Sequence, residues 1–199
     1  DIPGEASGLL PSREWKMNRH KQKWWPGDTI SVGIGQGYNL ATPLQLAFAT
    51  SIIANKGTAF RPHLVKRIQS SKSGEIFEKT PQILYQLNLN PKNLQIIRNA
   101  LIDVTKPGGT AAAAGAGTRY TFAGKTGTSQ VIGIKQGEKY DEDTINERHR
   151  DHALFIGYAP AKKPSIALSV LIENVHGGSA AAPIARQVMD YALLGKLPD

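Results

Sequence analysis

The stretch FAGKTGTSQV, residues 122–131, decides between two folds for the middle of this chain. A Walker-type phosphate loop needs G-x-x-x-x-G-K-[ST] and then a helix, because backbone N–H groups must surround the phosphates at a helix N-terminus. Gly124, Lys125 and Thr126 fit the end of that pattern, but Arg119 stands where its first glycine belongs. The β-branched residues that follow favour a strand. We therefore expect a β-strand that carries Lys-Thr-Gly-Thr into a cleft, where the glycine lets a ligand approach the backbone.

The composition is that of a globular domain. The chain has 199 residues, 40% of them hydrophobic, which predicts one domain or most of one. No run approaches the roughly 18 apolar residues of a membrane span, and no basic-then-apolar leader is present. The start, DIPGEASGLLP without an initiator methionine, leads us to expect a fragment whose preceding part could hold an anchor. The absence of cysteine excludes disulfides and thiol chemistry.

A net charge of +8 suits a partner rich in phosphate or carboxylate. Much of the positive charge lies in SREWKMNRHKQKWW, residues 12–25, where basic residues alternate with Trp15, Trp24 and Trp25. Such a mixture can bind nucleic acid through phosphate contacts and base stacking. No nucleic-acid motif accompanies it, so we favour a solvated loop whose tryptophans pack on the core and expect no nucleic-acid partner.

Three helices have recognisable ends. Residues 39–57 begin with Thr42 as N-cap, Pro43 at the first helical position and Gln45 completing a capping box, and Gly57 ends the helix. Residues 90–109 and 182–195 repeat this pattern with Asn90 and Pro91 at one start and Gly195 past the other end. The expected core-facing residues of the three helices are Leu44, Ala47, Phe48 and Ile52, then Leu94, Ile97, Leu101 and Val104, then Ile184, Val188 and Tyr191.

Strands are expected over residues 123–132, 153–160 and 165–174, and the apolar run of the last suits a strand buried on both faces. Three consecutive strands followed by a helix predict the α+β class, an antiparallel sheet with packed helices. The low-complexity stretch at 106–119 is interpreted as a mobile connector, and residues 135–151 as a charged connection too long for a tight hairpin turn. No internal repeat or domain boundary is visible.

Four blocks together resemble one family. They are WWPGDTISVGIGQGYNLATPLQLA (24–47), FAGKTGTSQV (122–131), RDHALFIGYAP (150–160) and GGSAAAPIARQVMDY (177–191). They look like the C-terminal part of the transpeptidase domain of class B penicillin-binding proteins, whose signature is S-x-x-K, S-D-N and K-T-G. Residues 134–160 are more similar to the elongation-type enzymes, represented by penicillin-binding protein 2, than to the septal ones. The resemblance spans nearly the whole chain, 1–199, and implies the serine β-lactamase / D,D-peptidase (penicillin-binding) fold.

The resemblance also implies site residues. The family transfers an acyl group from a D-Ala-D-Ala peptide stem, whose terminal carboxylate is held while a serine attacks the penultimate carbonyl. Lys125 would place positive charge near the nucleophile and the carboxylate, and Thr126 and Thr128 would donate hydroxyl hydrogen bonds to that carboxylate. Gly127 would keep the strand edge open for a substrate lying along it. The backbone N–H of Thr128 would be an oxyanion donor, and losing such a donor costs about 3 kcal/mol of transition-state stabilisation.

The nucleophile motif is not in this chain. None of its serines has a lysine three residues later, and no S-x-N or S-x-D occurs. We therefore expect a C-terminal portion that lacks the upstream part with the nucleophile and is inactive alone. The parent would cross-link peptidoglycan at the periplasmic face of the inner membrane, bind β-lactams, use no cofactor and work with a RodA-type membrane glycosyltransferase. A D,D-carboxypeptidase and a non-catalytic basic cell-wall-binding module stay open as alternatives.

Two smaller features are given less weight. Gly35, Gln36 and Gly37 could surround a phosphate, but a turn before the Thr42 cap needs glycines in any case, so we interpret them as structural. His149 and His152 have a spacing that metal ligands can use, yet no H-E-x-x-H motif or fourth ligand accompanies them, and no metal site is expected.

Overall fold

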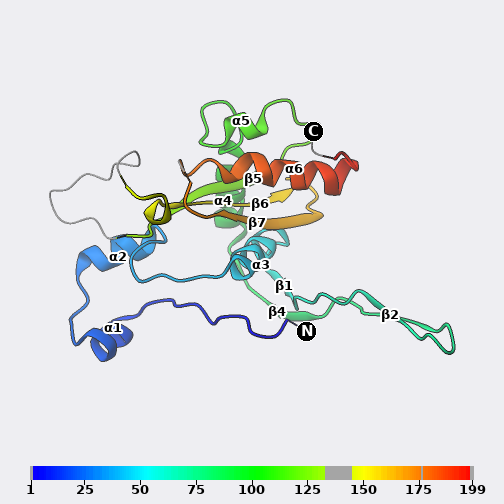
Figure 1. The fold of residues 1–199 in the computed structure, drawn as a ribbon, viewed down its shortest axis with the longest axis horizontal. Helices are drawn as coiled ribbons and strands as arrows, with labels where there is room; N and C mark the ends of the chain where they lie inside the picture. Colours follow the sequence, from blue (N-terminus) through cyan, green and yellow to red (C-terminus); the bar gives the residue numbers. More distant parts are fainter. Residues whose placement is uncertain (1, 133–144, 176, 198–199) are drawn as a thin grey trace.

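The computed structural model describes residues 2–132, 145–175 and 177–197. Within them three helices are followed by four short strands and two further helices, and then by a sheet of three longer strands and a last helix (Figure 1). The elements are α1 (Arg13–His20), α2 (Pro26–Gly33), α3 (Pro43–Ala54), β1 (Thr58–Phe60), β2 (Arg67–Gln69), β3 (Ile76–Glu78), β4 (Ile83–Gln86), α4 (Pro91–Asp103), α5 (Ala112–Gly115), β5 (Ala123–Ser129), the 3-10 helix η1 (Glu147–His149), β6 (His152–Ala159), β7 (Ile166–Ile172) and α6 (Ala181–Leu194).

The three-stranded sheet has the order β5-β6-β7 and is antiparallel throughout. Lys125 lies opposite Ile156 and Gly127 opposite Leu154, so these side chains share one face. The α+β class and the antiparallel sheet are confirmed. The K-T-G strand ends at Ser129, three residues before the predicted end. The charged connection at 135–151 lies mostly outside the described residues.

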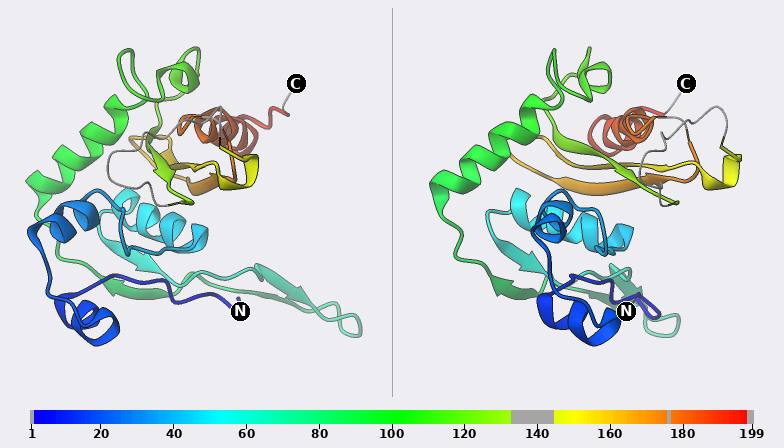
Figure 2. Two further views of the ribbon diagram at one scale, coloured as in Figure 1. Left: turned by 60° about the vertical axis from the view of Figure 1, so that its left-hand side comes forward. Right: turned by 90° about the vertical axis from the view of Figure 1, so that its left-hand side faces the viewer.

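Helices cover both faces of this sheet, with α6 on one side and α3 on the other (Figure 2). The α6 side holds the larger buried cluster, in which Phe155, Leu168 and Met189 meet alanines of α6. On the α3 side, Tyr158 packs with Ala54 and is fully buried. β7 contacts both helices, but Leu168 is its one buried residue and Leu171 is 37% exposed, so the prediction of a strand buried on both faces is only partly met.

Helix α6 packs by its small residues. Ala182, Ala185 and Met189 are buried against the sheet. The predicted inward stripe is wrong, because Ile184 and Val188 are 42% and 44% exposed and Tyr191 also faces solvent. Ile184, Val188 and Tyr191 lie on the outer face, because the sheet comes close to the helix and the contact is filled by alanines together with Met189.

Helix α3 begins as predicted. Thr42 Oγ1 accepts from Gln45 N at 3.1 Å and Gln45 Oε1 accepts from Thr42 N at 3.0 Å, a capping box. The amide of Gln45 also donates to the carbonyl of Ser7 at 2.9 Å and so fixes the N-terminal segment. Past the helix, Gly57 has a φ of +99°, and a Cβ there would lie 2.5 Å from Leu87 O, so only glycine fits.

Helix α4 buries an arginine where the pattern predicted isoleucine. Arg98 is 8% exposed and its guanidinium donates to the carbonyls of Ile53, Ala54 and Ala161 at 3.2, 2.8 and 2.9 Å. Ile97, predicted to face the core, is 49% exposed, so that prediction is wrong. The guanidinium satisfies carbonyls at the C-terminus of α3, which a helix end leaves without intrahelical partners.

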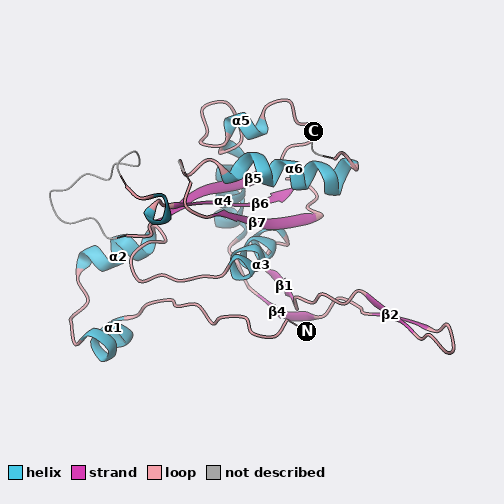
Figure 3. Cartoon of the chain, in the orientation of Figure 1, coloured by secondary structure: helices cyan, strands magenta, loops and turns pink. Residues whose placement is uncertain are grey.

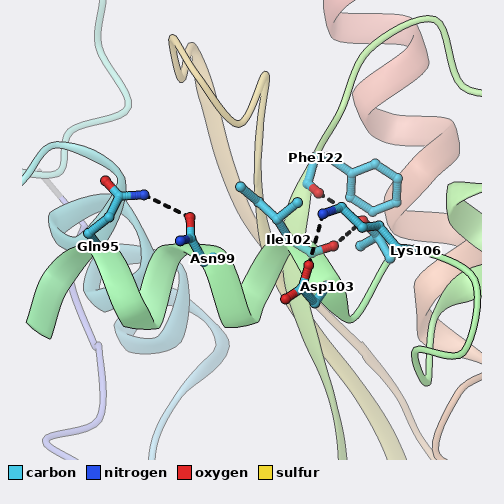
Figure 4. Close-up of polar contacts among 7 residues, drawn as sticks. Gln95, Asn99, Ile102, Asp103, Lys106 and Phe122 are labelled. Atoms are coloured by element: carbon cyan, nitrogen blue, oxygen red, sulfur yellow. Dashed lines mark hydrogen bonds and ion pairs between the residues drawn. The ribbon is translucent and has the colours of Figure 1, made fainter.

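The outer face and the end of α4 carry polar contacts (Figure 4). Gln95 donates to Asn99 at 2.7 Å one turn later, and Lys106 pairs with Asp103 at 2.9 Å. At the end of the helix, Thr105 Oγ1 donates to the carbonyl of Phe122 at 2.9 Å. This last bond is buried and ties α4 to the chain entering β5.

The stretch at 106–119 is structured, which overturns its interpretation as a mere connector. It contains α5, and Ala111 and Ala114 are buried in the main core. A Cβ on Gly109 would lie 2.2 Å from Val104 O, and one on Gly115 would lie 1.8 Å from Thr105 O. The small residues of this stretch therefore allow it to pack directly on the end of α4.

The N-terminal region and two small two-stranded sheets lie on the α3 side of this core (Figure 2). β1 pairs with β4, and the β2–β3 hairpin projects away from the sheet (Figure 3). Residues 13–20 form α1, not the predicted loop, and its Trp15 packs against Tyr38. The prediction that the tryptophans pack inward is wrong for Trp25, which is 60% exposed. No helix in the described part of the chain has the length and apolar character needed to cross a membrane.

Candidate active site

A cleft of about 1260 Å³ runs along β5 and across one face of the sheet. Its lining includes Leu154, Ile156 and Leu171 of the neighbouring strands and the segment before α3. β5 contributes every residue from Lys125 to Ser129 to its lining. The K-T-G-T strand therefore opens into a cleft, as the sequence predicted.

β5 lies at the edge of the sheet. In the described residues it pairs with β6 on one side only, so its other edge faces the cleft. An edge strand exposes backbone N–H and C=O groups that can pair with an extended peptide. The edge can thus bind a peptide backbone while side chains of the same strand contact its end group.

The polar side chains of β5 favour an anionic group. Lys125 is exposed, and its Nζ donates to Thr126 O at 2.7 Å and lies 3.3 Å from Thr126 Oγ1. Among the described residues that line the cleft, Lys125 is the only permanently charged side chain. The structure therefore brings Lys125, Thr126, Gly127 and Thr128 together on the cleft wall with one positive charge and two hydroxyls.

The two glycines of β5 differ in the steric clash that a side chain would cause. A Cβ on Gly124 would lie 2.1 Å from Cζ of Phe155, so this glycine is required by the core. A Cβ on Gly127 would lie 3.3 Å from Cβ of Leu154, a mild crowding on the face that lines the cleft. Gly127 is the one whose lack of a side chain leaves space next to the strand edge.

The turn between β7 and α6 packs over Thr128. A Cβ on Gly178 would lie 2.1 Å from Thr128 Oγ1, so any larger residue would displace that hydroxyl. Ser179 follows and also lines the cleft. The sequence showed the GGS block only as part of the family resemblance, and the contact with Thr128 depends on the folded arrangement of distant segments.

Thr110 is a site residue that sequence reasoning missed. Its Oγ1 lies 2.9 Å from Thr126 Oγ1, and it lines the cleft together with β5. It belongs to the low-complexity stretch, where only the pair of glycines before it hinted at a close approach.

The glycine-rich turn before α3 also belongs to the cleft. Gly35 and Gly37 have φ values of +78° and +72°, and both line the cleft together with Gln36. Reading this turn as structural alone was therefore incomplete. The glycines are needed by the turn, and the turn brings Gln36 to the lining of the cleft.

Within the described parts of the chain, His149 and His152 belong to no cluster that could hold a metal ion. His152 Nδ1 accepts from the backbone N of Asn174 at 3.0 Å, and His149 lies in η1. The described residues contain no group of three or more side chains able to hold a metal ion.

Comparison with known proteins places this geometry in a family. The model of the penicillin binding protein transpeptidase domain matches residues 1–190. This chain belongs to that family. Peptidoglycan D,D-transpeptidase MrdA of Acinetobacter baumannii is 45% identical over 98% of the chain, and that of Haemophilus influenzae is 42% identical over all of it.

Solved structures agree with this assignment. Penicillin-binding protein 2 of Pseudomonas aeruginosa, solved in complex with WCK 5153, is 43% identical with a TM-score of 0.78, and the match covers the whole chain and 41% of that protein. Penicillin-binding protein 2 of Helicobacter pylori, solved in complex with MreC, is 30% identical over 98% of the chain and 33% of that protein, with a TM-score of 0.74. The chain has the penicillin-binding transpeptidase fold. It spans 28% and 31% of the two curated relatives above.

Proposed function

We propose that residues 1–199 are the C-terminal portion of the transpeptidase domain of an elongation-type peptidoglycan D,D-transpeptidase. The parent protein would cross-link D-Ala-D-Ala peptide stems by serine acyl transfer and would be acylated by β-lactams. Support comes from the family membership and from the 37–45% identity to relatives named peptidoglycan D,D-transpeptidase MrdA.

The observation that carries the proposal is the cleft along the open edge of β5. A peptide stem lying antiparallel or parallel to this edge would place its terminal carboxylate near Lys125, Thr126 and Thr128. Charge-assisted hydrogen bonds from these groups would hold the carboxylate. The backbone N–H of Thr128 would stabilise the oxyanion as the carbonyl becomes tetrahedral.

The attacking serine and its lysine base would lie on the part of the parent outside these 199 residues. No serine here has a lysine three positions later, which is the arrangement the family uses. In the complete enzyme the serine attacks the penultimate D-Ala carbonyl, terminal D-Ala leaves, and an amine of a second stem takes the acyl group. The role of this chain is to bind and orient the acyl donor.

The proposal extends to the setting of the parent, and the resemblance to elongation-type enzymes supports it. We propose that it works at the periplasmic face of the inner membrane, held by a segment outside this chain, with peptidoglycan stems as substrates. A RodA-type glycosyltransferase would supply the glycan strands, and an MreC-type protein, which the Helicobacter pylori relative binds, would be a second partner.

The test is covalent labelling of the full-length protein with a fluorescent penicillin. We expect a denaturation-resistant adduct on the parent and none on the 199-residue chain alone. Incubation of the parent with peptide stems should then give cross-linked dimers. Release of D-Ala without dimers would instead assign a carboxypeptidase, and no adduct on the parent would assign a binding module without chemistry.

Replacing Lys125 tests the site itself. In the full-length protein, Lys125→Ala should slow acylation about 30- to 1000-fold, because a charge-assisted contact worth roughly 2–4 kcal/mol in the transition state is lost. The melting temperature should stay close to that of the unaltered protein, since Lys125 is exposed. Lys163→Ala, at an exposed lysine of the β6–β7 turn, is the matched control and should change neither quantity. Normal acylation by Lys125→Ala would remove this lysine from the site.

A further inference from the structure

Thr110 stands on a firmly packed support. The backbone N of Ala111 donates to Val104 O at 2.9 Å, and the side chain of Ala111 is buried in the main core. Just before it, Gly109 N donates to Lys106 O at 2.9 Å, and any Cβ on Gly109 would collide with the end of α4. The backbone at Thr110 is therefore held firmly, and its hydroxyl lies beside β5.

The hydroxyl of Thr110 is next to the hydroxyl of Thr126. The number of hydrogen bonds that the Thr126 hydroxyl can make is limited. A threonine Oγ1 has one proton to donate and two lone pairs that accept. Lys125 Nζ, which can only donate, lies 3.3 Å from one side of Thr126 Oγ1. Thr110 Oγ1 is 2.9 Å away, and by geometry either hydroxyl can be the donor.

The two directions of this bond have opposite consequences. If Thr126 donated to Thr110, its single proton would be used within the protein and could not reach a ligand carboxylate. If Thr110 donates, both lone pairs of Thr126 are occupied and its proton is left to point into the cleft that both residues line. A carboxylate accepts hydrogen bonds and does not donate them, so its presence favours the second direction.

We propose that Thr110 is a positioning residue that donates to Thr126 and thereby directs the Thr126 proton at the carboxylate of the acyl donor. The inference rests on the proposed function and adds to it a source of selectivity. Acyl donors with a free carboxylate gain from the directed proton, and donors whose carboxylate is blocked do not. Because two donors to one hydroxyl oxygen also polarise its O–H bond, the bond to the ligand is strengthened.

The test compares two probes on the full-length protein. Second-order acylation rate constants are measured with benzylpenicillin and with its methyl ester, which lacks the carboxylate charge. Valine has nearly the same shape as threonine without the hydroxyl. Thr110→Val should therefore slow acylation by benzylpenicillin about 3- to 10-fold, the range of one neutral hydrogen bond, and should leave the rate of acylation by the ester unchanged. Thr110→Ser should restore the rate with benzylpenicillin.

A double-mutant cycle identifies the route of the effect. Adding Thr110→Val to Thr126→Val should cause no further loss, because Thr110 acts only through the hydroxyl already removed. Thr80→Val, at an exposed threonine between β3 and β4, is the control and should leave both rates unchanged. The ratio of the two probes is taken on one sample, so a partly unfolded variant still gives a valid value.

Three results would overturn the proposal. An unchanged ratio of the two probes in Thr110→Val means that Thr110 does not act on the carboxylate. Losses that multiply in the double variant mean that it does not act through Thr126. If the unaltered protein is not acylated by benzylpenicillin at all, the proposed function falls, and the role of Thr110 with it.

Discussion

Two tyrosines in this domain differ in what their hydroxyl groups contact. Tyr120 Oη donates to Asp190 Oδ1 at 2.7 Å. Tyr158 is fully buried, and its hydroxyl has no hydrogen-bond partner among the described residues. Burial raises the pKa of both phenols, with Asp190 adding to the effect at Tyr120, whereas the charge of Arg98 opposes it at Tyr158.

The raised pKa values predict a loss of stability in alkali. An unfolded tyrosine ionises near pH 10, whereas the folded protein keeps the phenol neutral, so the stabilisation is complete below pH 10 and is lost as the pH rises toward the folded pKa. Tyr158→Phe should reduce this decline by up to about 1.4 kcal/mol per pH unit. Urea unfolding at pH 7, 9 and 11 measures the free energy of unfolding as a function of pH. An equal decline with pH for Tyr158→Phe and the unaltered protein would contradict the prediction.

At pH 7 the same two positions should behave in opposite ways. Tyr158→Phe removes an unpaired buried hydroxyl and should be neutral or stabilising, by up to about 1–2 kcal/mol. Tyr120→Phe removes a donor from Asp190 and should cost about 1–2 kcal/mol. The midpoints of the urea curves at pH 7 give both values, and each variant serves as control for the other.

Some site residues could be predicted from a contiguous sequence motif, whereas others are brought to the site only by the fold. Lys125, Thr126, Gly127 and Thr128 could be predicted because the motif is contiguous and the family resemblance gives it a role. Thr110 could not, because its significance is a distance of 2.9 Å to a residue 16 positions away. Gly178 was also missed as a contact of Thr128, since only the fold brings the turn over that hydroxyl.

At the scale of elements, Arg98 connects three of them. Its guanidinium joins α4 to the C-terminus of α3 and to the turn after β6 through three carbonyl bonds. Arg98→Met keeps much of the apolar volume but leaves buried carbonyls without donors. We expect a loss of about 3–5 kcal/mol, because each unsatisfied buried group costs about 1–3 kcal/mol.

The control for this prediction is a second arginine. Arg61→Met, on an exposed arginine that contacts Gln82 beside β1, should cost less than about 0.5 kcal/mol. Thermal and urea unfolding compare the two variants. A small effect of Arg98→Met would show that the carbonyls find water or other donors and that the arginine is dispensable.

The packing face of α6 gives a second test at this scale. Ala185 is fully buried between the helix and the sheet, whereas Val188 is 44% exposed. Ala185→Leu should overpack the contact and cost about 1–3 kcal/mol, and Val188→Ala should change stability by less than about 0.5 kcal/mol. The periodicity of large apolar residues predicts the reverse order, so melting temperatures decide directly between the two faces.

Helix ends were predictable, whereas helix faces were predictable only in part: Ile52 is buried and Leu101 and Val104 pack on the core as expected, but other positions do not, for a physical reason. The caps at Thr42, Asn90 and Gly195 depend on side chains and backbone angles within a few residues, and all three are present. The buried face depends on what packs against it. Alanines of α6 meet a sheet at close approach, and Arg98 of α4 meets carbonyls, and neither partner is visible in the hydrophobic pattern.

At the scale of the whole molecule, the region around the cleft leaves several large apolar side chains exposed. Helix α2 has no buried residue, and Ile34 and Leu40, which line the cleft, are 69% and 63% exposed. By contrast, the sheet β5-β6-β7 and the helices α3 and α6 that cover it enclose two clusters of buried side chains. Exposed apolar side chains gathered at one cleft are typical of a surface that contacts other protein surface.

The isolated 199-residue chain should therefore bind a hydrophobic dye and self-associate. Burying a side chain such as isoleucine or leucine contributes about 1.5–3 kcal/mol, so contacts between exposed cleft walls outweigh the repulsion of a chain with net charge +8, above all in salt. The double variant Ile34→Ser, Leu40→Ser should lower dye fluorescence and shift sedimentation toward the monomer. Leu197→Ser, at a leucine 70% exposed near the C-terminus and not among the residues lining the cleft, should change neither. A compact monomer that binds no dye would mean that the apolar walls close on each other, and the cleft would then have to open before a peptide could reach β5.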